Sequence, residues 1–187
     1  MTRILLHICC ASCAIFPVSV LREEGFAAHG FFFNPNIQPY TEFQKRLETL
    51  DGWARAEDLP LIVRAEYDPQ SFFRQAAFRE AQRCIHCYSQ RLNAAASLAR
   101  RSRFDAFTST LLCSRRQKHD LVVSLAEEAA RRYKIPFLYR DFRVGWKQGQ
   151  ERAKSLGLYR QQYCGCIYSE HERYVKKSGR KDESVNG

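Results

Sequence analysis

The sequence lacks the features that would place it in a membrane or outside the cell. No segment approaches the roughly 20 apolar residues of a membrane-spanning helix, and the apolar segment Ile4–Ile8 is too short for the core of a signal peptide. Acidic residues are scarce, because 20 Asp and Glu stand against 30 Lys and Arg, for a net charge of +10. We therefore expect a cytoplasmic protein that has no membrane partner.

The excess of basic residues favours an anionic partner, with RNA or DNA first and a basic protein without a polyanion as the alternative. The basic residues occur in four clusters: Arg100, Arg101 and Arg103; Arg115, Arg116 and Lys118; Arg131, Arg132 and Lys134; Arg140 and Arg143. Interleaved aromatic residues such as Trp146 could stack on exposed bases, although most of them suit a core better.

Internal repeats are also absent, as are low-complexity segments outside the tail. The 187 residues suit one domain, and a hydrophobic content of 45% is enough for a packed core. We predict one α/β catalytic domain over residues 1–174. The mostly polar and basic residues 175–187 are predicted to form a flexible tail.

Short apolar segments alternate with amphipathic ones. Strands are predicted at residues 4–8, 26–33, 61–65, 104–110 and 136–139. Helices are predicted at residues 14–24, 41–57, 70–78, 84–100, 117–133 and 147–156, and after Gly165. This alternation predicts a Rossmann-like parallel sheet with helices on both faces, plus a small helical insertion over about 66–103. Pro17 is expected in the first turn of its helix, and Thr41 with Gln44 suggests a capping box.

Seven of the eight cysteines fall into three short segments: Cys9, Cys10 and Cys13; Cys84 and Cys87; Cys164 and Cys166. In a reducing compartment, thiolates grouped this closely are typical of metal ligands, although the Cys84–Cys87 spacing is shared by redox-active disulfides. Seven exceed the four ligands of a tetrahedral zinc. The count indicates an iron–sulfur cluster, alone or beside a second metal, and therefore electron transfer. One zinc that unites the segments and scattered buried cysteines are the alternatives.

The first cysteines directly follow a predicted strand. Ligands of parallel sheets bind at the carboxyl ends of strands, and a helix N-terminus favours thiolates. Adjacent strand residues point to opposite sides, so Cys9 and Cys10 are expected to serve different metals or different corners of one site. Cys113 is expected to be a small buried residue, and His7 a core histidine with satisfied hydrogen bonds.

Several segments together resemble the metal-dependent epoxyqueuosine reductases of the QueH type. They are Leu6–Cys13, Phe33–Ile37, Cys84–Tyr88, Phe107–Leu112, Gln117–His119, Tyr139–Arg143 and Gly157–Cys166. The resemblance runs from residue 4 to about 174. It implies the final step of queuosine synthesis, which is removal of the epoxide oxygen from epoxyqueuosine at the wobble position of tRNA. It also implies a [4Fe-4S] cluster, an adjacent mononuclear metal, expected to be iron, and a fold like that of the ATP-pyrophosphatase (HUP) group.

The cysteines from Cys9 to Cys13 occupy the turn where ATP-pyrophosphatases carry a Gly/Ser-rich phosphate loop, which argues against ATP use. Two other classes stay open. One is an ATP-dependent tRNA-modifying enzyme of the same fold, and the other is a zinc-stabilised RNA-binding module without redox activity.

One hypothesis divides the ligands between two metals. Cys10, Cys13, Cys84 and Cys87 hold the cluster, and Cys9, Cys164 and Cys166 hold the second metal, which would polarise the epoxide oxygen. An external donor supplies electrons.

Groups beside the metals also receive expected roles. Asp141 and His119 are candidate proton donors. Their alternatives are an ion pair with Arg140 or Arg143 and a phosphate contact, respectively. Tyr88 and Tyr163 are expected to shield the metals or to donate hydrogen bonds to sulfur.

Overall fold

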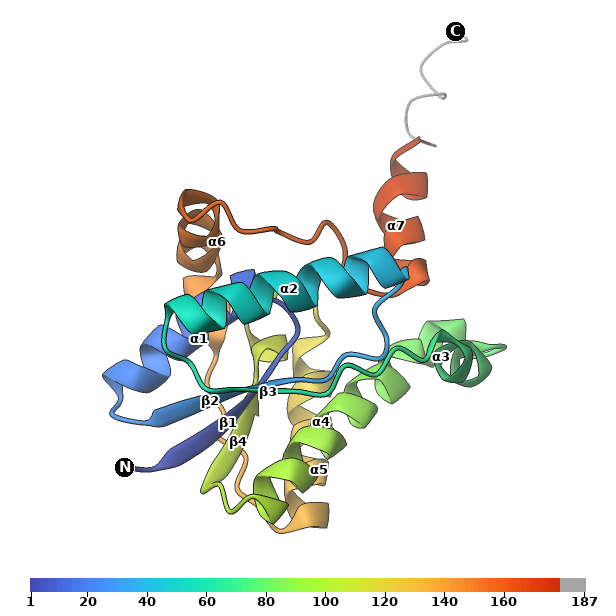
Figure 1. The fold of residues 1–187 in the computed structure, drawn as a ribbon. Helices are drawn as coiled ribbons and strands as arrows, with labels where there is room; N and C mark the ends of the chain where they lie inside the picture. Colours follow the sequence, from blue (N-terminus) through green and yellow to red (C-terminus); the bar gives the residue numbers. More distant parts are fainter. Residues whose placement is uncertain (179–187) are drawn as a thin grey trace, which may run out of the picture.

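A computed structural model describes residues 1–178. Its strands are β1 (Arg3–Ile8), β2 (Ala27–Phe32), β3 (Leu61–Val63) and β4 (Ala106–Ser109). They form one parallel sheet in the order β3-β2-β1-β4 (Figure 1). Its α-helices are α1 (Ala11–Glu23), α2 (Tyr40–Ala56), α3 (Pro69–Ala76), α4 (Arg83–Arg101), α5 (His119–Tyr133), α6 (Trp146–Ser155) and α7 (Ile167–Ser178). Three short 3₁₀-helices are η1 (Glu80–Gln82), η2 (Thr110–Leu112) and η3 (Phe142–Gly145). Within the described residues, no helix combines the length and the apolar character that crossing a bilayer requires.

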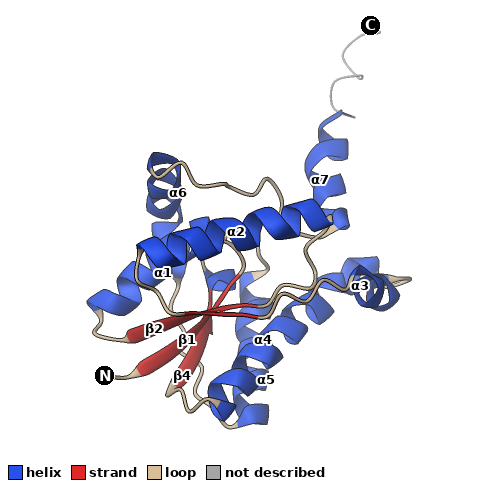
Figure 2. Ribbon diagram, in the orientation of Figure 1, coloured by secondary structure: helices blue, strands red, loops and turns tan. Residues whose placement is uncertain are grey.

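The helices cover both faces of the sheet (Figure 2), because β1 is apolar on both of its sides. Ile4, Leu6 and Ile8 belong to the core that includes α1 and α2. Leu5, from the same strand, belongs to the core that includes α4 and α5. Alternate strand residues point to opposite faces, so a continuous apolar strand needs cover on both. The expected α/β architecture is confirmed.

The sheet order places a topological switch point between β1 and β4. The chain moves from β1 through β2 to β3 on one side, and then returns to place β4 on the other side of β1. Connections diverge at such a point, which leaves a crevice beyond the carboxyl ends of the two central strands. Cys9 and Cys10 directly follow β1 and therefore stand at this crevice.

The N-terminal ends of α1 and α2 differ from the expectations in ways that bear on the site or on capping. Helix α1 begins at Ala11 rather than residue 14, so Pro17 lies inside the helix and not in its first turn. The earlier start makes Cys10 the N-cap residue. The capping box expected from Thr41 and Gln44 was wrong, since Pro39 precedes α2 and no side-chain cap forms.

The predicted fifth strand does not form as a regular element. Phe137 makes only an isolated parallel bridge with Phe107, through a hydrogen bond from the Phe107 N–H to the Pro136 carbonyl and one from the Leu138 N–H to the Phe107 carbonyl. Proline has no N–H to donate, which shortens the ladder.

Helices α3 and α4 follow β3, in the range of about 66–103 where a helical insertion was expected. Helix α4 packs on the main core through Leu92 and Ala95. Of the predicted tail, α7 includes the part up to Ser178, and residues 179–187 lie outside the described residues.

Two glycines offer a test of the packing between α1 and α6. A Cβ at Gly145 would lie 2.2 Å from the Phe16 ring, whereas a Cβ at Gly52, inside α2, would meet nothing within 4 Å. Gly145→Ala is expected to destabilise the protein by about 1–3 kcal/mol through overpacking. Gly52→Ala is expected to stabilise it by up to about 1 kcal/mol. Urea unfolding of both variants measures this, and equal midpoints would contradict the close approach.

Candidate metal centre

Three cysteine sulfurs meet at the end of β1. The Sγ atoms of Cys9, Cys10 and Cys13 lie within 4.8 Å of one another, and all three residues are buried. The Cys9 and Cys10 sulfurs are 3.6 Å apart. The expectation that these two side chains face different sides was therefore wrong. Strand β1 ends at Ile8, so the alternation of a strand no longer applies to them.

Without a cation beside them, the thiols of Cys9, Cys10 and Cys13 cannot all lose their protons. Hydrogen bonds from Cys10 and Cys13 lower the pKa of the Cys9 thiol. Burial raises the pKa of Cys10, and the bonds to Cys10 and Cys9 raise that of Cys13. One thiolate thus opposes the next, because like charges in a buried site repel. A soft cation relieves this repulsion, so the donor set fits a thiophilic metal.

A second group of cysteines lines one cavity of about 330 Å³. Cys84 and Cys87 come from the start of α4, and Cys164 and Cys166 from the segment before α7. Asn36 lines the same cavity, and neither polar atom of its buried amide has a hydrogen-bond partner within the described part of the chain. A buried amide without partners is costly, so the cavity suits a group that can satisfy it.

Neighbouring side chains donate hydrogen bonds to sulfur at both groups. Arg91 Nη2 lies 3.0 Å from Cys87 Sγ, and Gln117 Nε2 lies 3.2 Å from Cys164 Sγ. Gln161 Nε2 lies 3.4 Å from Cys13 Sγ. Hydrogen bonds to ligating sulfur tune a metal centre, so these contacts belong to its outer shell.

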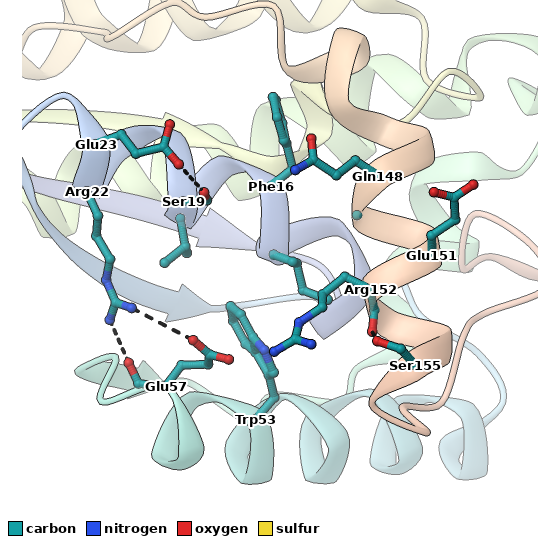
Figure 3. A pocket seen from close by; sticks show the side chains of 13 residues that line it. Phe16, Ser19, Arg22, Glu23, Trp53, Glu57, Gln148, Glu151, Arg152 and Ser155 are labelled. Carbon is teal, nitrogen blue, oxygen red and sulfur yellow. Dashed lines mark hydrogen bonds and ion pairs between the residues drawn. The ribbon is translucent and has the colours of Figure 1, made fainter.

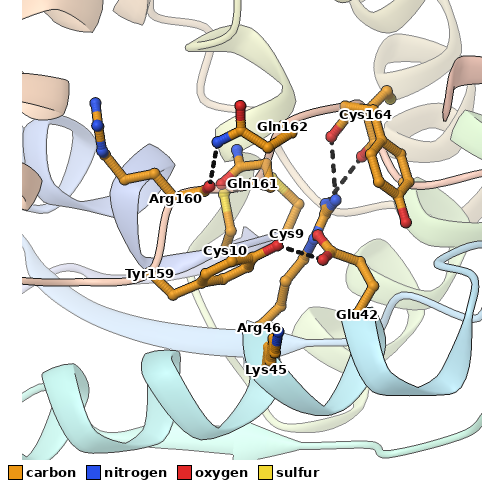
Figure 4. A network of polar contacts seen from close by, with 12 residues as sticks. Cys9, Cys10, Glu42, Lys45, Arg46, Tyr159, Arg160, Gln161, Gln162 and Cys164 are labelled. Atoms are coloured by element: carbon orange, nitrogen blue, oxygen red, sulfur yellow. Dashed lines mark hydrogen bonds and ion pairs between the residues drawn. The ribbon is translucent and has the colours of Figure 1, made fainter. Parts of the chain in front are cut away.

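A buried arginine ties the carboxyl-terminal cysteine segment to α2 (Figure 4). The Arg46 guanidinium donates to the carbonyls of Cys164 at 2.9 Å and Tyr163 at 3.0 Å. It also pairs with Glu42 at 2.7 Å, and Glu42 accepts a hydrogen bond from the Tyr159 hydroxyl. Burial opposes the charge of Arg46, but the attraction of Cys10 and of the Glu42 carboxylate prevails and raises the Arg46 pKa.

Sequence reasoning missed Arg46, Arg91 and Gln161. Arg91 had a detectable signal, because it follows Cys87 by four residues and so shares its helix face. Arg46 had none, since Cys164, whose carbonyl it contacts, lies 118 residues away along the chain. Gln161 lies in the segment Gly157–Cys166 that carried the resemblance, but its contact with Cys13, 148 residues away, was not accessible.

Three other expectations have clear outcomes. His7 is a core histidine as predicted, with its ring nitrogens 2.9 Å from Ser109 Oγ and 3.1 Å from the Phe33 carbonyl. Cys113 is buried with the main core. Neither tyrosine donates to sulfur, because the Tyr88 hydroxyl donates to Gln117 and the Tyr163 hydroxyl donates to the Gln38 carbonyl.

The two candidate proton donors lie near each other outside the cysteine groups. Asp141 forms a 2.6 Å ion pair with Arg143, and the hydrogen bond from Arg143 lowers the pKa of Asp141 to about 2. His119 Nε2 lies 3.1 Å from the Tyr139 hydroxyl. The ion pair considered for Asp141 is therefore present, with Arg143 as the partner.

A cavity elsewhere contains no sulfur ligand. It measures about 710 Å³ and lies between α1, α2 and α6 (Figure 3). Its lining includes Phe16, Trp53 and Arg152, and the Arg22–Glu57 pair crosses one side. Size alone does not identify a site, and the chemistry of this chain is concentrated at the sulfurs.

The parallel sheet and the thiol-lined crevice at its switch point define an α/β protein whose buried cysteines could hold a metal ion. Similarity to a solved structure supports the fold: a crystal structure described as a predicted subunit of tRNA methyltransferase from Methanocaldococcus jannaschii matches with a TM-score of 0.57. The match covers 96% of this chain and 89% of that chain at 13% identity. The expected Rossmann-like fold, a parallel sheet with helices on both faces, is thus confirmed.

Sequence comparison gives the family. Residues 4–172 match the profile of the family described as epoxyqueuosine reductase QueH. A protein of that name from Dehalococcoides mccartyi is 37% identical over 93% of this chain and 96% of its own length. Another, from Thermotoga maritima, is 33% identical over 94% of both chains. The chain belongs to the epoxyqueuosine reductase QueH family, a family of oxidoreductases, as the resemblance implied.

Gly165 between the last two cysteines gives a test of how they are positioned. Its φ is +152°, and a Cβ there would lie 3.1 Å from Ile37 Cγ1 and 3.2 Å from Asn36 Nδ2. Gly165→Ala is therefore expected to displace Cys164 and Cys166 and to lower the amount of metal bound per chain. Gly157→Ala is the control, because its φ of +66° carries strain but nothing lies within 4 Å. Metal analysis after anaerobic purification distinguishes the two variants, and equal metal contents would refute the positioning role.

Proposed function

We propose that this chain reduces epoxyqueuosine to queuosine at the wobble position of tRNA. The two carbon–oxygen bonds of the epoxide break, an alkene forms, and the oxygen leaves as water. The reaction therefore consumes two electrons and two protons. The electrons come from an external donor, since the thiols of this chain are needed as ligands.

The convergence of seven cysteines at the crevice beyond β1 supports this proposal. Three sulfurs gather directly after β1, and four more line the neighbouring cavity. Family membership favours the reductase over the ATP-dependent enzyme and the zinc module. We include in the proposal one catalytic domain over residues 1–174 that carries the whole site.

The two groups favour a division of ligands that differs from the earlier hypothesis. We propose that Cys84, Cys87, Cys164 and Cys166 hold a [4Fe-4S] cluster, whose usual complement is four thiolates. Cys9, Cys10 and Cys13 then hold a mononuclear iron, where three protein ligands leave a position for substrate. Bound iron supplies one-electron transfer and Lewis acidity.

The residues around these groups have separate tasks. Arg46 holds the carboxyl-terminal cysteine segment in place. Arg91 and Gln117 donate to sulfur, which favours the more electron-rich state of a bound metal. Of the two candidate proton donors, we propose His119, because Asp141 is fixed as a carboxylate by Arg143.

The net charge of +10 favours binding of a polyanion such as the tRNA substrate. Arg116 and Lys118 line the cysteine cavity itself, and Arg160 lines the pocket next to it. These exposed cations are placed to contact phosphates around the anticodon, so binding is expected to weaken steeply with salt.

Removal of two ligands tests the metal assignment. Anaerobically purified protein is expected to be brown and to contain iron and acid-labile sulfide. The double variant Cys84→Ala, Cys87→Ala is expected to lose this absorbance and the turnover of tRNA that carries epoxyqueuosine. Cys113→Ala is the matched control, since Cys113 is buried but lies outside both groups. A colourless wild-type protein with zinc and no sulfide would overturn the redox assignment.

The proton donors are distinguished by kinetics. Because the pKa of Asp141 is about 2, its carboxyl stays ionised from about pH 5 to 9 and has no proton to give. Asp141→Asn is therefore expected to keep the shape of the pH–rate profile. His119→Gln is expected to lower kcat by about 10²–10⁴-fold, the usual loss of an acid catalyst. The opposite ranking of the two variants would make Asp141 the donor.

A further inference from the structure

A small polar pocket adjoins the cysteine cavity. It measures about 210 Å³ and is lined by Arg116, Trp146, Gln150, Gln161, Gln162 and Cys164, among others. Arg116 and Cys164 line the cysteine cavity as well. The polar pocket and the cysteine cavity thus share a wall, and that wall contains a sulfur atom.

This pocket reaches both groups of sulfurs. Cys164 belongs to the second group, and Gln161 donates a 3.4 Å hydrogen bond to Cys13 Sγ of the first. Gln161 also accepts a 3.0 Å hydrogen bond from the Ser12 hydroxyl, which fixes its amide. A ligand in this pocket therefore contacts Cys164 of the second group directly, and through Gln161 it is one hydrogen bond away from Cys13 of the first group. The cavity between α1, α2 and α6 has no comparable contact.

The walls of the pocket carry the chemistry that recognises a nucleobase. Three glutamine amides, from Gln150, Gln161 and Gln162, each combine hydrogen-bond donors with an acceptor. Gln150 makes no side-chain hydrogen bond with any residue from 1 to 178 that would compete for its amide. Trp146 adds a half-buried aromatic ring at the start of α6. Proteins read unstacked bases by stacking on aromatic rings and by hydrogen bonds to the base edges.

Two arginine side chains, those of Arg115 and Arg116, lie beside this pocket, where they can contact the phosphates of a bound strand. Arg116 is exposed and is held by a 2.9 Å hydrogen bond from Nη1 to the Gln162 carbonyl. The Arg115 guanidinium lies 5.8 Å from the centre of the Trp146 ring. Arginines at the rim of a base pocket contact the flanking phosphates, which orient the strand without reading its sequence.

We propose that this pocket receives the wobble base of the tRNA after the base leaves its stack. Trp146 stacks on the base, Gln150 and Gln162 bond to its edge, and Cys164 marks the end that faces the metal centre. The volume is below the roughly 300–1,000 Å³ of sites for drug-sized ligands, which suits a single base. This inference rests on the proposed function and adds the site that selects its substrate.

The test compares two RNAs on the metal-loaded protein. One is an anticodon stem-loop with epoxyqueuosine at the wobble position, and the other is the same RNA with an abasic site there. Fluorescence anisotropy of an end label gives both dissociation constants. Trp146→Ala is expected to weaken binding of the first RNA by roughly 5- to 150-fold, the equivalent of one lost stacking contact. Binding of the abasic RNA is expected to stay unchanged, because phosphate contacts remain.

Further variants keep the test sharp if Trp146→Ala folds poorly. Trp146→Phe keeps a ring and is expected to retain most of the difference between the two RNAs. Gln150→Ala is expected to raise KM with a smaller effect on kcat. Gln148→Ala is its matched control on the same helix, since Gln148 is exposed and lines the cavity between α1, α2 and α6.

The possible failures are distinguishable. In one outcome, the wild-type protein reduces epoxyqueuosine, and the variants Trp146→Phe, Trp146→Ala and Gln150→Ala keep the wild-type KM and the wild-type preference for the RNA with the base. The proposal that this pocket binds the base is then refuted, and the proposed function stands. If the loaded wild-type protein with dithionite gives no queuosine, the proposed function is wrong. The abasic comparison still decides whether a base enters the pocket.

Discussion

The buried guanidinium of Arg91 sets the constraint on which the site depends. Its Nε donates to the Cys87 carbonyl and its Nη2 to the Cys87 sulfur, and within residues 1–178 no carboxylate pairs with it. A buried cation without a counter-charge is strongly destabilising. Burial opposes the charge, yet the attraction of Cys87 and Cys164 prevails and raises the Arg91 pKa. This arginine therefore favours negative charge on the sulfur atoms beside it.

Burial also disfavours the charged form of the cysteines beside Arg91. Burial raises the pKa of Cys87 to about 12 and also raises that of Cys164. Without a further cation, these thiols remain neutral and leave Arg91 poorly compensated. Metal binding releases their protons and creates the missing negative charge. Arginine and metal therefore depend on each other, which makes the cysteine cavity a site built for a charged occupant.

Much of this arrangement was accessible from the sequence, and what was not has identifiable causes. The apolar segment Ile4–Ile8 and the cysteines directly after it predicted a sulfur site at the carboxyl edge of the sheet. In a parallel sheet, residues that follow a strand lie at that edge whatever the order of the strands. The division of the cysteines was not accessible, since it depends on how α4 and the segment around Gly165 meet in space. The fifth strand was over-predicted because its apolar residues match a strand, whereas the single bridge at Phe137 is all that the backbone makes.

The basic residues show why charge alone could not locate the RNA surface. Arg100 and Arg101 end α4, and Arg131 and Arg132 end α5. At a helix C-terminus a cation interacts favourably with the helix dipole, so these two pairs stabilise the fold itself. Both helices begin at the site and end away from it, since Cys84 in the first turn of α4 and Lys118 at the N-cap of α5 line the cysteine cavity. Arg140 and Arg143 are paired with Glu24 and Asp141. Of the four clusters, only the one with Arg115, Arg116 and Lys118 supplies residues that line the cysteine cavity, namely Arg116 and Lys118. A polyanion drawn to this end of the sheet meets the reactive groups directly, and one drawn to the other end does not.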